Sequence, residues 1–266
     1  MFNRLLCFSF LCVCAMLAAF AAPTATTPTF PVPKDGLVIW LDASDTATLT
    51  LQGTSVSAWK DKSGSGITAA QTDATLCPQL IKNALNTQAA VRFNGTTQYL
   101  DLGNKGELAQ EYTIIAVLQA TQLAQQEAYF TNRQFFYEGE SSPLYLGFTQ
   151  NQPFAYYNTA STSFVLGKDS GISANVPFLQ TLQASAKTKT VTFFVNGGRV
   201  NETKDITNLA TRVLGGYLGF DAETKDHFGG DLAEFIVYTR LLTDAERKQV
   251  EGYLLKKYGL TAAPAN

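Results

Sequence analysis

The sequence predicts an all-β protein in which two antiparallel sheets form a sandwich, with one α-helix at the C-terminal end. Three observations support this fold. Short runs of β-branched and aromatic residues recur along the 266-residue chain at roughly even spacing. Glycine-rich turns separate these runs. A helical pattern with both end signals is found only after residue 242. We do not expect a parallel sheet, because strands do not alternate with helices.

The first 35 residues are predicted to precede the folded domain. Asn3-Arg4, an apolar run and the small-x-small pattern Ala19-Phe20-Ala21 are typical of a secretory signal peptide, residues 1–21. A retained membrane anchor is the alternative, because the run approaches the length that spans a bilayer. Residues 22–35 form a Pro/Thr-rich linker.

One domain is expected over residues 36–260, followed by a tail at 261–266. The chain is 45% hydrophobic and 16% charged, so its core needs no disulfide. Three of the four cysteines lie in the predicted signal peptide, and the remaining Cys77 has no partner for an internal disulfide. A secreted domain without disulfides favours a bacterial source and a location outside the cell, in the periplasm or at the cell surface.

Charge excludes two classes of partner. The net charge is -2, and Lys and Arg are scattered rather than gathered in a stripe. We therefore expect no binding to nucleic acid and no insertion into a membrane once the signal peptide is removed. We expect a monomer.

The predicted strands begin at Leu37–Leu41, which is followed by an acidic turn at Asp42–Asp45. Tyr112–Leu118 is almost wholly apolar and β-branched, as in a central strand buried on both faces. Asn94-Gly95 and Asn196-Gly197-Gly198 each predict a hairpin. Further strands are expected at Val56–Trp59, Ala90–Phe93, Tyr99–Leu102, Tyr129–Phe130, Phe135–Tyr137, Leu144–Phe148, Pro177–Gln183, Thr190–Val195 and Val213–Phe220.

The C-terminal end reads as a strand followed by a helix. Phe235–Tyr238 is β-branched and aromatic. Thr243 and Glu246 have the spacing of a capping box. Apolar residues at 250, 254 and 258 follow at helical spacing, and Gly259 allows a left-handed stop. Such an amphipathic helix must rest on a sheet.

Several motifs resemble the bacterial laminin-G-like jelly rolls of the concanavalin A-like lectin/glucanase superfamily. They are Trp40–Asp45, Trp59–Gly64, Val91–Gly95, Phe194–Gly197, Gly230–Tyr238, Leu242–Arg247 and Tyr253–Gly259. The resemblance covers about residues 36–260. It implies a jelly-roll sandwich with a concave face and rim loops that commonly bind glycans, and often a structural calcium ion.

Two groups of residues have the chemistry of a sugar site, which combines aromatic faces with amides or carboxylates. Tyr156, Tyr157 and Asn158 form the first group, and Trp59 with Asp61 forms the second. The alternative for the tyrosines is that one packs in the core and the other is a single exposed ring. The alternative for Trp40 and Trp59 is a place in the core.

The resemblance also implies calcium ligands. Asp42, with Asp45 beside it, Asn94 and Asp231 would converge if the first and last strands pair. Carboxylate and amide oxygens are the donors that Ca²⁺ prefers. The alternative is that these side chains bond turn amides.

No catalytic residue is predicted. The Glu-x-Asp-x-x-Glu pattern of the related glucanases is missing, and Glu138 and Glu140 are the only local candidates for a carboxylate pair. The single histidine, His227, has no nucleophile motif to serve. We therefore predict a secreted, non-catalytic module that recognises a polysaccharide, a glycoprotein or another cell-surface protein. A divergent glycoside hydrolase or polysaccharide lyase, and a structural or adhesion module without a small ligand, are the alternatives.

Overall fold

The computed structural model describes residues 32–108, 110–131, 144–157, 163–166, 170–204, 212–222 and 224–264. The predicted signal peptide, most of the linker and the expected strand Phe135–Tyr137 lie outside these residues. Within them, α1 (Asp244–Tyr258) is the one α-helix, beside a short 3-10 turn, η1 (Thr46–Thr48). None of the described helices combines the length and the apolar character that crossing a membrane requires.

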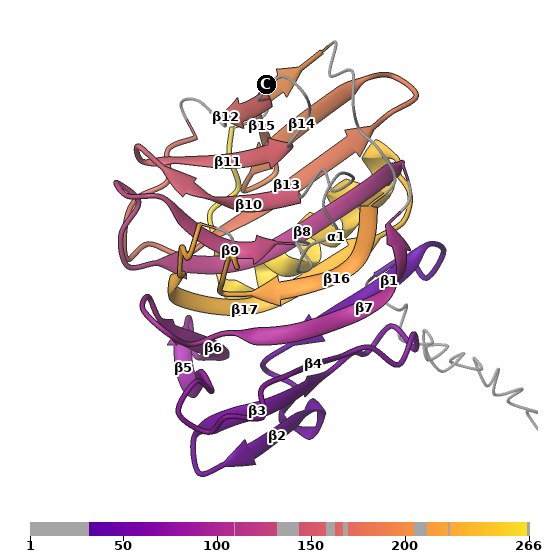
Figure 1. Cartoon of the computed structure of the whole chain (residues 1–266). Coiled ribbons are helices and arrows are strands. Elements are labelled where there is room, and N and C mark those ends of the chain that lie inside the picture. Colours follow the sequence, from indigo (N-terminus) through magenta and orange to yellow (C-terminus); the bar gives the residue numbers. More distant parts are fainter. Residues whose placement is uncertain are drawn as a thin grey trace, which may run out of the picture. The chain divides into compact units, whose positions relative to one another are not determined.

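The described strands are paired antiparallel throughout, and they form the two layers of a sandwich (Figure 1). Layer A contains β1 (Leu37–Asp42), β5 (Gln79–Leu85), β6 (Gln88–Asn94), β8 (Glu111–Ala120), β13 (Phe178–Ser185), β14 (Thr190–Val195), β15 (Gly198–Thr203) and β17 (Gly229–Tyr238). Layer B contains β2 (Leu49–Gln52), β3 (Ser55–Lys60), β4 (Thr68–Ala70), β7 (Leu100–Leu108), β9 (Glu127–Thr131), β10 (Leu144–Thr149), β11 (Gln152–Tyr157), β12 (Ser163–Leu166) and β16 (Arg212–Leu218). A single pairing, Ser55 with Gln79, joins them.

Alternation along the strands decides which side chains enter the core. In β8, Ile114, Ala116 and Leu118 face the space between the layers, whereas Ile115 and Val117 face the opposite side. The inner set packs against residues of layer B, such as Leu146 of β10. The outer set packs against α1. The prediction of a central strand buried on both faces is confirmed for β8.

The strand β17 is the centre of layer A. It pairs with β8 along one edge. Along the other edge it pairs with β6 through residues 229–232 and with β1 through residues up to Tyr238. The last strand of the chain therefore lies beside the first strand of the domain, and all ten of its residues are buried.

One of the two predicted hairpins is confirmed. β14 and β15 pair through Val195 and Gly198, and Asn196 and Gly197 both have positive φ. Two central residues with positive φ match the twist of the flanking strands.

The hairpin predicted at Asn94-Gly95 is wrong. In the described structure β6 pairs with β5 and β17, and β7 pairs with β4 and β16. Asn94 Oδ1 instead accepts three following backbone N–H groups (residues 96–98) at 2.9–3.1 Å. Gly95 N donates to Phe228 O at 3.1 Å. These bonds turn the chain from layer A into layer B.

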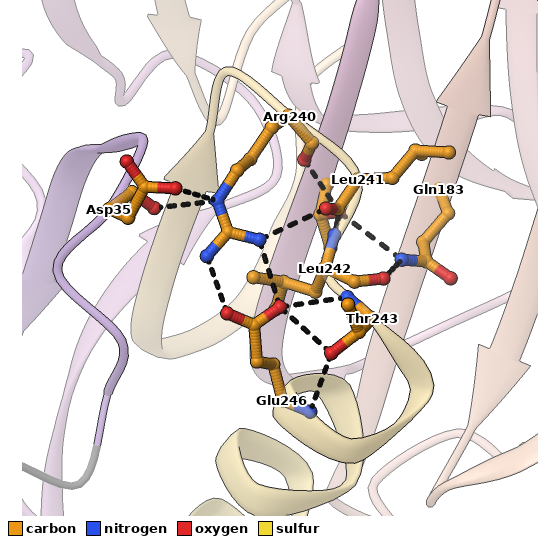
Figure 2. Close-up of polar contacts among 8 residues, drawn as sticks. Asp35, Gln183, Arg240, Leu241, Leu242, Thr243 and Glu246 are labelled. Carbon is orange, nitrogen blue, oxygen red and sulfur yellow. Dashed lines mark hydrogen bonds and ion pairs between the residues drawn. The ribbon is translucent and has the colours of Figure 1, made fainter.

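The junction between β17 and α1 confirms the predicted capping box (Figure 2). Thr243 Oγ1 accepts from Glu246 N at 3.3 Å, and the Glu246 carboxylate accepts from Thr243 N at 2.9 Å. Arg240 binds the same carboxylate through two nitrogens, at 2.7 and 2.9 Å. Gly259 ends the helix with φ 60°, as predicted.

Both ends of the predicted domain extend further than the sequence indicated. Val32 is buried in the cluster beneath α1, and Asp35 forms an ion pair with Arg240 at 2.9 Å (Figure 2). In the expected tail, Ala263 N donates to Asn196 O at 2.8 Å. Residues 32–35 and 262–264 therefore belong to the packed domain, because specific contacts hold each segment on it.

Candidate functional site

The motifs that carry the family resemblance converge on one buried charge network. Glu234 of β17 is fully buried and accepts from Trp40 Nε1 at 2.6 Å. Its second oxygen accepts from Lys257 Nζ at 2.7 Å and from Tyr258 OH at 2.9 Å. Lys257 also contacts Asp42 at 2.8 Å. The first strand, the last strand and the helix are thus held together by one set of polar contacts.

Electrostatics support a structural role for this network. Burial and the charge of Asp42 raise the pKa of Glu234, against the opposing effect of Lys257. Burial also disfavours the charged form of Asp42, but Lys257, Ser44 and Lys62 outweigh it and lower the pKa of this carboxyl. Glu234 and Asp42 are buried, and their carboxylates are engaged by groups of the protein. They hold the sandwich and the helix together.

The second predicted sugar pair belongs to the same framework. Trp59 is fully buried in the core, so its ring is not open to a sugar, and the core alternative is confirmed for both tryptophans. Asp61 Oδ1 accepts from Trp40 N at 2.6 Å. The remaining contacts of Asp61 bind the loop after it, through N–H and hydroxyl groups of residues 63–65. Its carboxylate organises this loop.

Each of the three predicted calcium ligands is bonded to other groups of the protein. Asp42 is held by Lys62 and Lys257, and both oxygens of Asp231 accept from Arg92, at 2.7 and 2.8 Å. Asn94 caps the amides of its own turn. Across the described ranges, no group of three or more acidic, histidine or cysteine side chains is arranged to hold a metal ion. Calcium thus rests on the resemblance alone.

The two outer faces of the sandwich differ: α1 covers the outer face of layer A, and polar and aromatic side chains lie on the outer face of layer B. The α-helix packs on the outer face of layer A, and in Figure 1 it lies behind β8 and β17. On β7, Leu100 and Leu102 enter the core, so Asp101 between them faces outward. Asp101 lies opposite Ala70 of β4 and Tyr217 of β16. Directly opposed residues share a face, so all three belong to the outer face of layer B.

Half-buried rings gather at this face. We call Tyr99, Tyr217, Phe220 and His227 the aromatic patch. The Tyr99 ring lies edge-on to Tyr217 at 5.6 Å and 5.2 Å from Phe220. Tyr217 and Phe220 are 5.8 Å apart, and the His227 ring stacks on Phe220 at 4.6 Å. Each ring keeps part of its surface in solvent.

A hollow of about 300 Å³ adjoins the aromatic patch. Tyr99 and Asp101 form one side, and Gln71 is buried at another. The hollow also includes Thr68, Ala70, Thr72, Leu102 and Gly103. Asp101 Oδ1 accepts from Gly103 N at 2.6 Å, which fixes the carboxylate at the rim. Rings beside an oriented carboxylate, an amide and hydroxyl groups can stack on a sugar and hydrogen-bond to its hydroxyls.

The titratable groups of the aromatic patch are shifted by burial and by acidic neighbours. Burial raises the pKa of Tyr217, and Asp101 adds to this effect. Burial lowers the pKa of His227, although a hydrogen bond with the Gln98 backbone and the charge of Asp226 act against it. The lowered pKa favours the neutral form of the His227 imidazole.

The first predicted sugar group is described only in part. Tyr156 and Tyr157 lie in β11, where the backbone of Tyr156 is opposite Tyr145 of β10. Asn158 lies outside the described residues, as do Glu138 and Glu140. A sugar contact at Tyr156 and Tyr157 stays a prediction.

A larger hollow, of about 740 Å³, lies between α1, the β14–β15 hairpin and residues 262–264. Its buried groups bind one another: Arg247 contacts Glu251 at 2.6 Å and lies 3.8 Å over the Phe194 ring. The Arg247 guanidinium thus covers the Phe194 ring closely, whereas Lys225 Nζ lies 5.7 Å from one ring of the aromatic patch and the patch contains three further partly exposed rings. The aromatic patch on layer B is therefore the better candidate for a binding site.

The comparisons agree with this architecture. Residues 94–246 match the family model of the concanavalin A-like lectin/glucanases superfamily, and the chain belongs to that family. No curated protein matches the chain in sequence.

Solved structures share the fold at low identity. The binding domain of Paraclostridial Mosquitocidal Protein 1 is 14% identical over 84% of this chain and 53% of that one, with a TM-score of 0.57. The botulinum neurotoxin serotype D ligand-binding domain, in complex with N-acetylneuraminic acid, is 11% identical over 84% and 52%, with a TM-score of 0.58. Domain 4 of AbnA, a GH43 extracellular arabinanase from Geobacillus stearothermophilus, in complex with arabinotriose, is 13% identical over 81% and 98%, with a TM-score of 0.56. The chain thus spans about half of each toxin structure and nearly all of the arabinanase domain.

Proposed function

We propose that this protein is a non-catalytic glycan-binding module that acts outside the cell or at its surface, and that the aromatic patch is its binding surface. The observation that carries this proposal is the set of part-exposed rings around a hollow with an oriented carboxylate, on the outer face opposite α1. Sugars offer flat C–H faces to rings and hydroxyls to carboxylates, so this arrangement suits them.

Two further points support the proposal. The chain belongs to a superfamily of lectins and glucanases, and proteins of the same fold were solved with N-acetylneuraminic acid and with arabinotriose. The framework motifs are occupied in holding the fold, which leaves the aromatic patch as the described surface with the chemistry of a sugar site.

The test begins with a glycan array, followed by calorimetric titration of the strongest ligand. Tyr217→Ala and Tyr99→Ala each remove a ring, and we expect at least tenfold weaker binding, about 1.4 kcal/mol. Tyr253→Ala removes a half-buried ring from α1, on the other layer, and serves as the matched control. Melting curves establish that each variant is folded. Binding that is equal in the patch variants and the control would rule out this surface.

The non-catalytic part of the proposal has its own measurement. We expect no release of reducing sugar when the protein is incubated with the polysaccharide that it binds. Release above the blank, lost in Asp101→Asn, would instead favour the glycosidase alternative.

A further inference from the structure

We infer that the aromatic patch selects neutral oligosaccharides and discriminates against sugars that carry a carboxylate. This inference rests on the proposed function and specifies the class of ligand. It sets this chain apart from the neurotoxin domain of similar fold, which was solved with the acidic sugar N-acetylneuraminic acid.

The first argument is the position of Asp101. The carboxylate is exposed at the rim of the hollow, with Tyr99 beside it and Tyr217 opposite it. Its Oδ1 is engaged by Gly103 N. The second oxygen of Asp101, Oδ2, is a strong acceptor for the hydroxyl donors of a neutral sugar. The same oxygen repels the carboxylate of a sialic or uronic acid held against the rings.

The second argument is the charge around the rings. Asp221 and Asp226 lie between Phe220 and His227 in the chain; Asp221 is fully buried, whereas Asp226 is partly exposed and its Oδ2 accepts from Tyr145 OH at 2.9 Å. Two ammonium groups also lie on this face, one over a ring of the patch and one beside the hollow. Lys225 Nζ is 5.7 Å from the Phe220 ring, and Lys60 lies opposite Thr68 at the far side of the hollow.

The third argument is what the hollow lacks. The residues around it include Thr68, Gln71 and Thr72, which form hydrogen bonds without charge. Arginine, whose fork binds carboxylates bidentately, is not among the described residues that form the hollow or the aromatic patch. The described lining of the hollow therefore offers hydroxyl-binding groups and the Asp101 carboxylate, and the two ammonium groups lie outside it.

The experiment compares matched pairs of ligands by calorimetric titration at low salt: lactose with α2,3-sialyllactose, and galactotriose with trigalacturonate. We expect the wild-type protein to bind the neutral member of a pair at least tenfold more tightly. Asp101→Asn keeps the size of the side chain and an acceptor for Gly103, and it should narrow this ratio several-fold. Asp244→Asn, an exposed carboxylate on α1, removes the same charge elsewhere and should leave the ratio unchanged.

The outcomes separate the two proposals. Equal or tighter binding of the acidic members, lost in Tyr217→Ala, overturns the selectivity but leaves the glycan-binding surface in place. An unchanged ratio in Asp101→Asn also overturns the selectivity. If neither these pairs nor any glycan on the array binds the wild-type protein, the proposed function fails and the selectivity fails with it.

Discussion

Lys257, in the last turn of α1, donates to Glu234 of β17 at 2.7 Å and lies 2.8 Å from Asp42 of β1. One ammonium group thus compensates two buried carboxylates on strands from opposite ends of the domain. A buried pair adds little stability compared with apolar residues, but losing one partner leaves charge without compensation. The helix is therefore fixed on layer A by charge as well as by apolar packing.

Lys257→Met should be strongly destabilising. It keeps most of the apolar stem and leaves Glu234 and Asp42 without their shared cation, at a cost of about 3–5 kcal/mol. Urea denaturation measures the loss. Lys256→Met, at the exposed neighbouring position, should change stability by less than about 0.5 kcal/mol. Equal effects of the two variants would contradict the assigned role of Lys257.

Glu246→Gln should make the free energy of unfolding depend less on pH in the acidic range. The hydrogen bonds from Arg240, together with the Thr243 N–H, lower the pKa of Glu246 from 4.5 to about 2. The charged form therefore stabilises the folded state above about pH 4.5, and this contribution is lost as the pH falls toward 2. We expect the free energy of unfolding of the wild type to exceed that of the variant by about 1 kcal/mol at pH 7. This difference should shrink as the pH falls from about 4.5 toward 2.

Denaturant titrations at pH 7, 5, 4 and 3 measure this difference. Asp244→Asn is the control, because its side chain is 82% exposed in the same helical turn. A difference between wild type and Glu246→Gln that stays constant across the series would show that the ion pair of Figure 2 does not contribute.

Arg92→Met tests the contact that holds Asp231, one of the predicted calcium ligands. Asp231 is 1% exposed, so loss of its guanidinium partner should cost about 3 kcal/mol. We expect the same loss in excess EGTA and in excess Ca²⁺, and an unchanged melting temperature of the wild-type protein in both. A wild-type midpoint that falls in EGTA would instead reveal a cation bound to the native state.

Asp61→Asn distinguishes a structural role of Asp61 from a role in binding a sugar. The amide offers one acceptor where the carboxylate offers two, so the loop at residues 63–65 loses several bonds. We expect a loss of about 2–3 kcal/mol in stability. The affinity of the folded variant for a neutral glycan should stay within about twofold of wild type. A large loss of affinity in a variant that melts normally would return Asp61 to the binding surface.

Local signals in the sequence predicted much of the fold. The capping box of Thr243 and Glu246, the stop at Gly259 and the hairpin at Asn196 depend on residues within a few positions of one another. The Asn94-Gly95 dipeptide gave an equally strong signal and was misleading. The conformation at this dipeptide depends on Phe228, which lies more than one hundred positions later and whose carbonyl oxygen accepts from the Gly95 N–H.

The candidate site could not be predicted from such local signals. Tyr99, Tyr217 and Phe220 come together through the register of β7 and β16, which a single sequence does not specify. One signal was present: Asp101 between Leu100 and Leu102 marks a polar side chain that faces outward. Trp59 and Asp61 had the composition of a sugar site, but burial decides what an aromatic ring can contact, and burial depends on the whole fold.

The position of β17 also sets when this protein can fold. The strand β17 borders β1, β6 and β8, and it is synthesised after most of the chain. Because ribosomes add about 5–20 residues per second, roughly ten seconds or more pass before β17 is complete. Until it emerges, those three strands have no shared neighbour, and long-range pairing of this kind is slow. Layer A can therefore close only after the ribosome has synthesised residues 229–238.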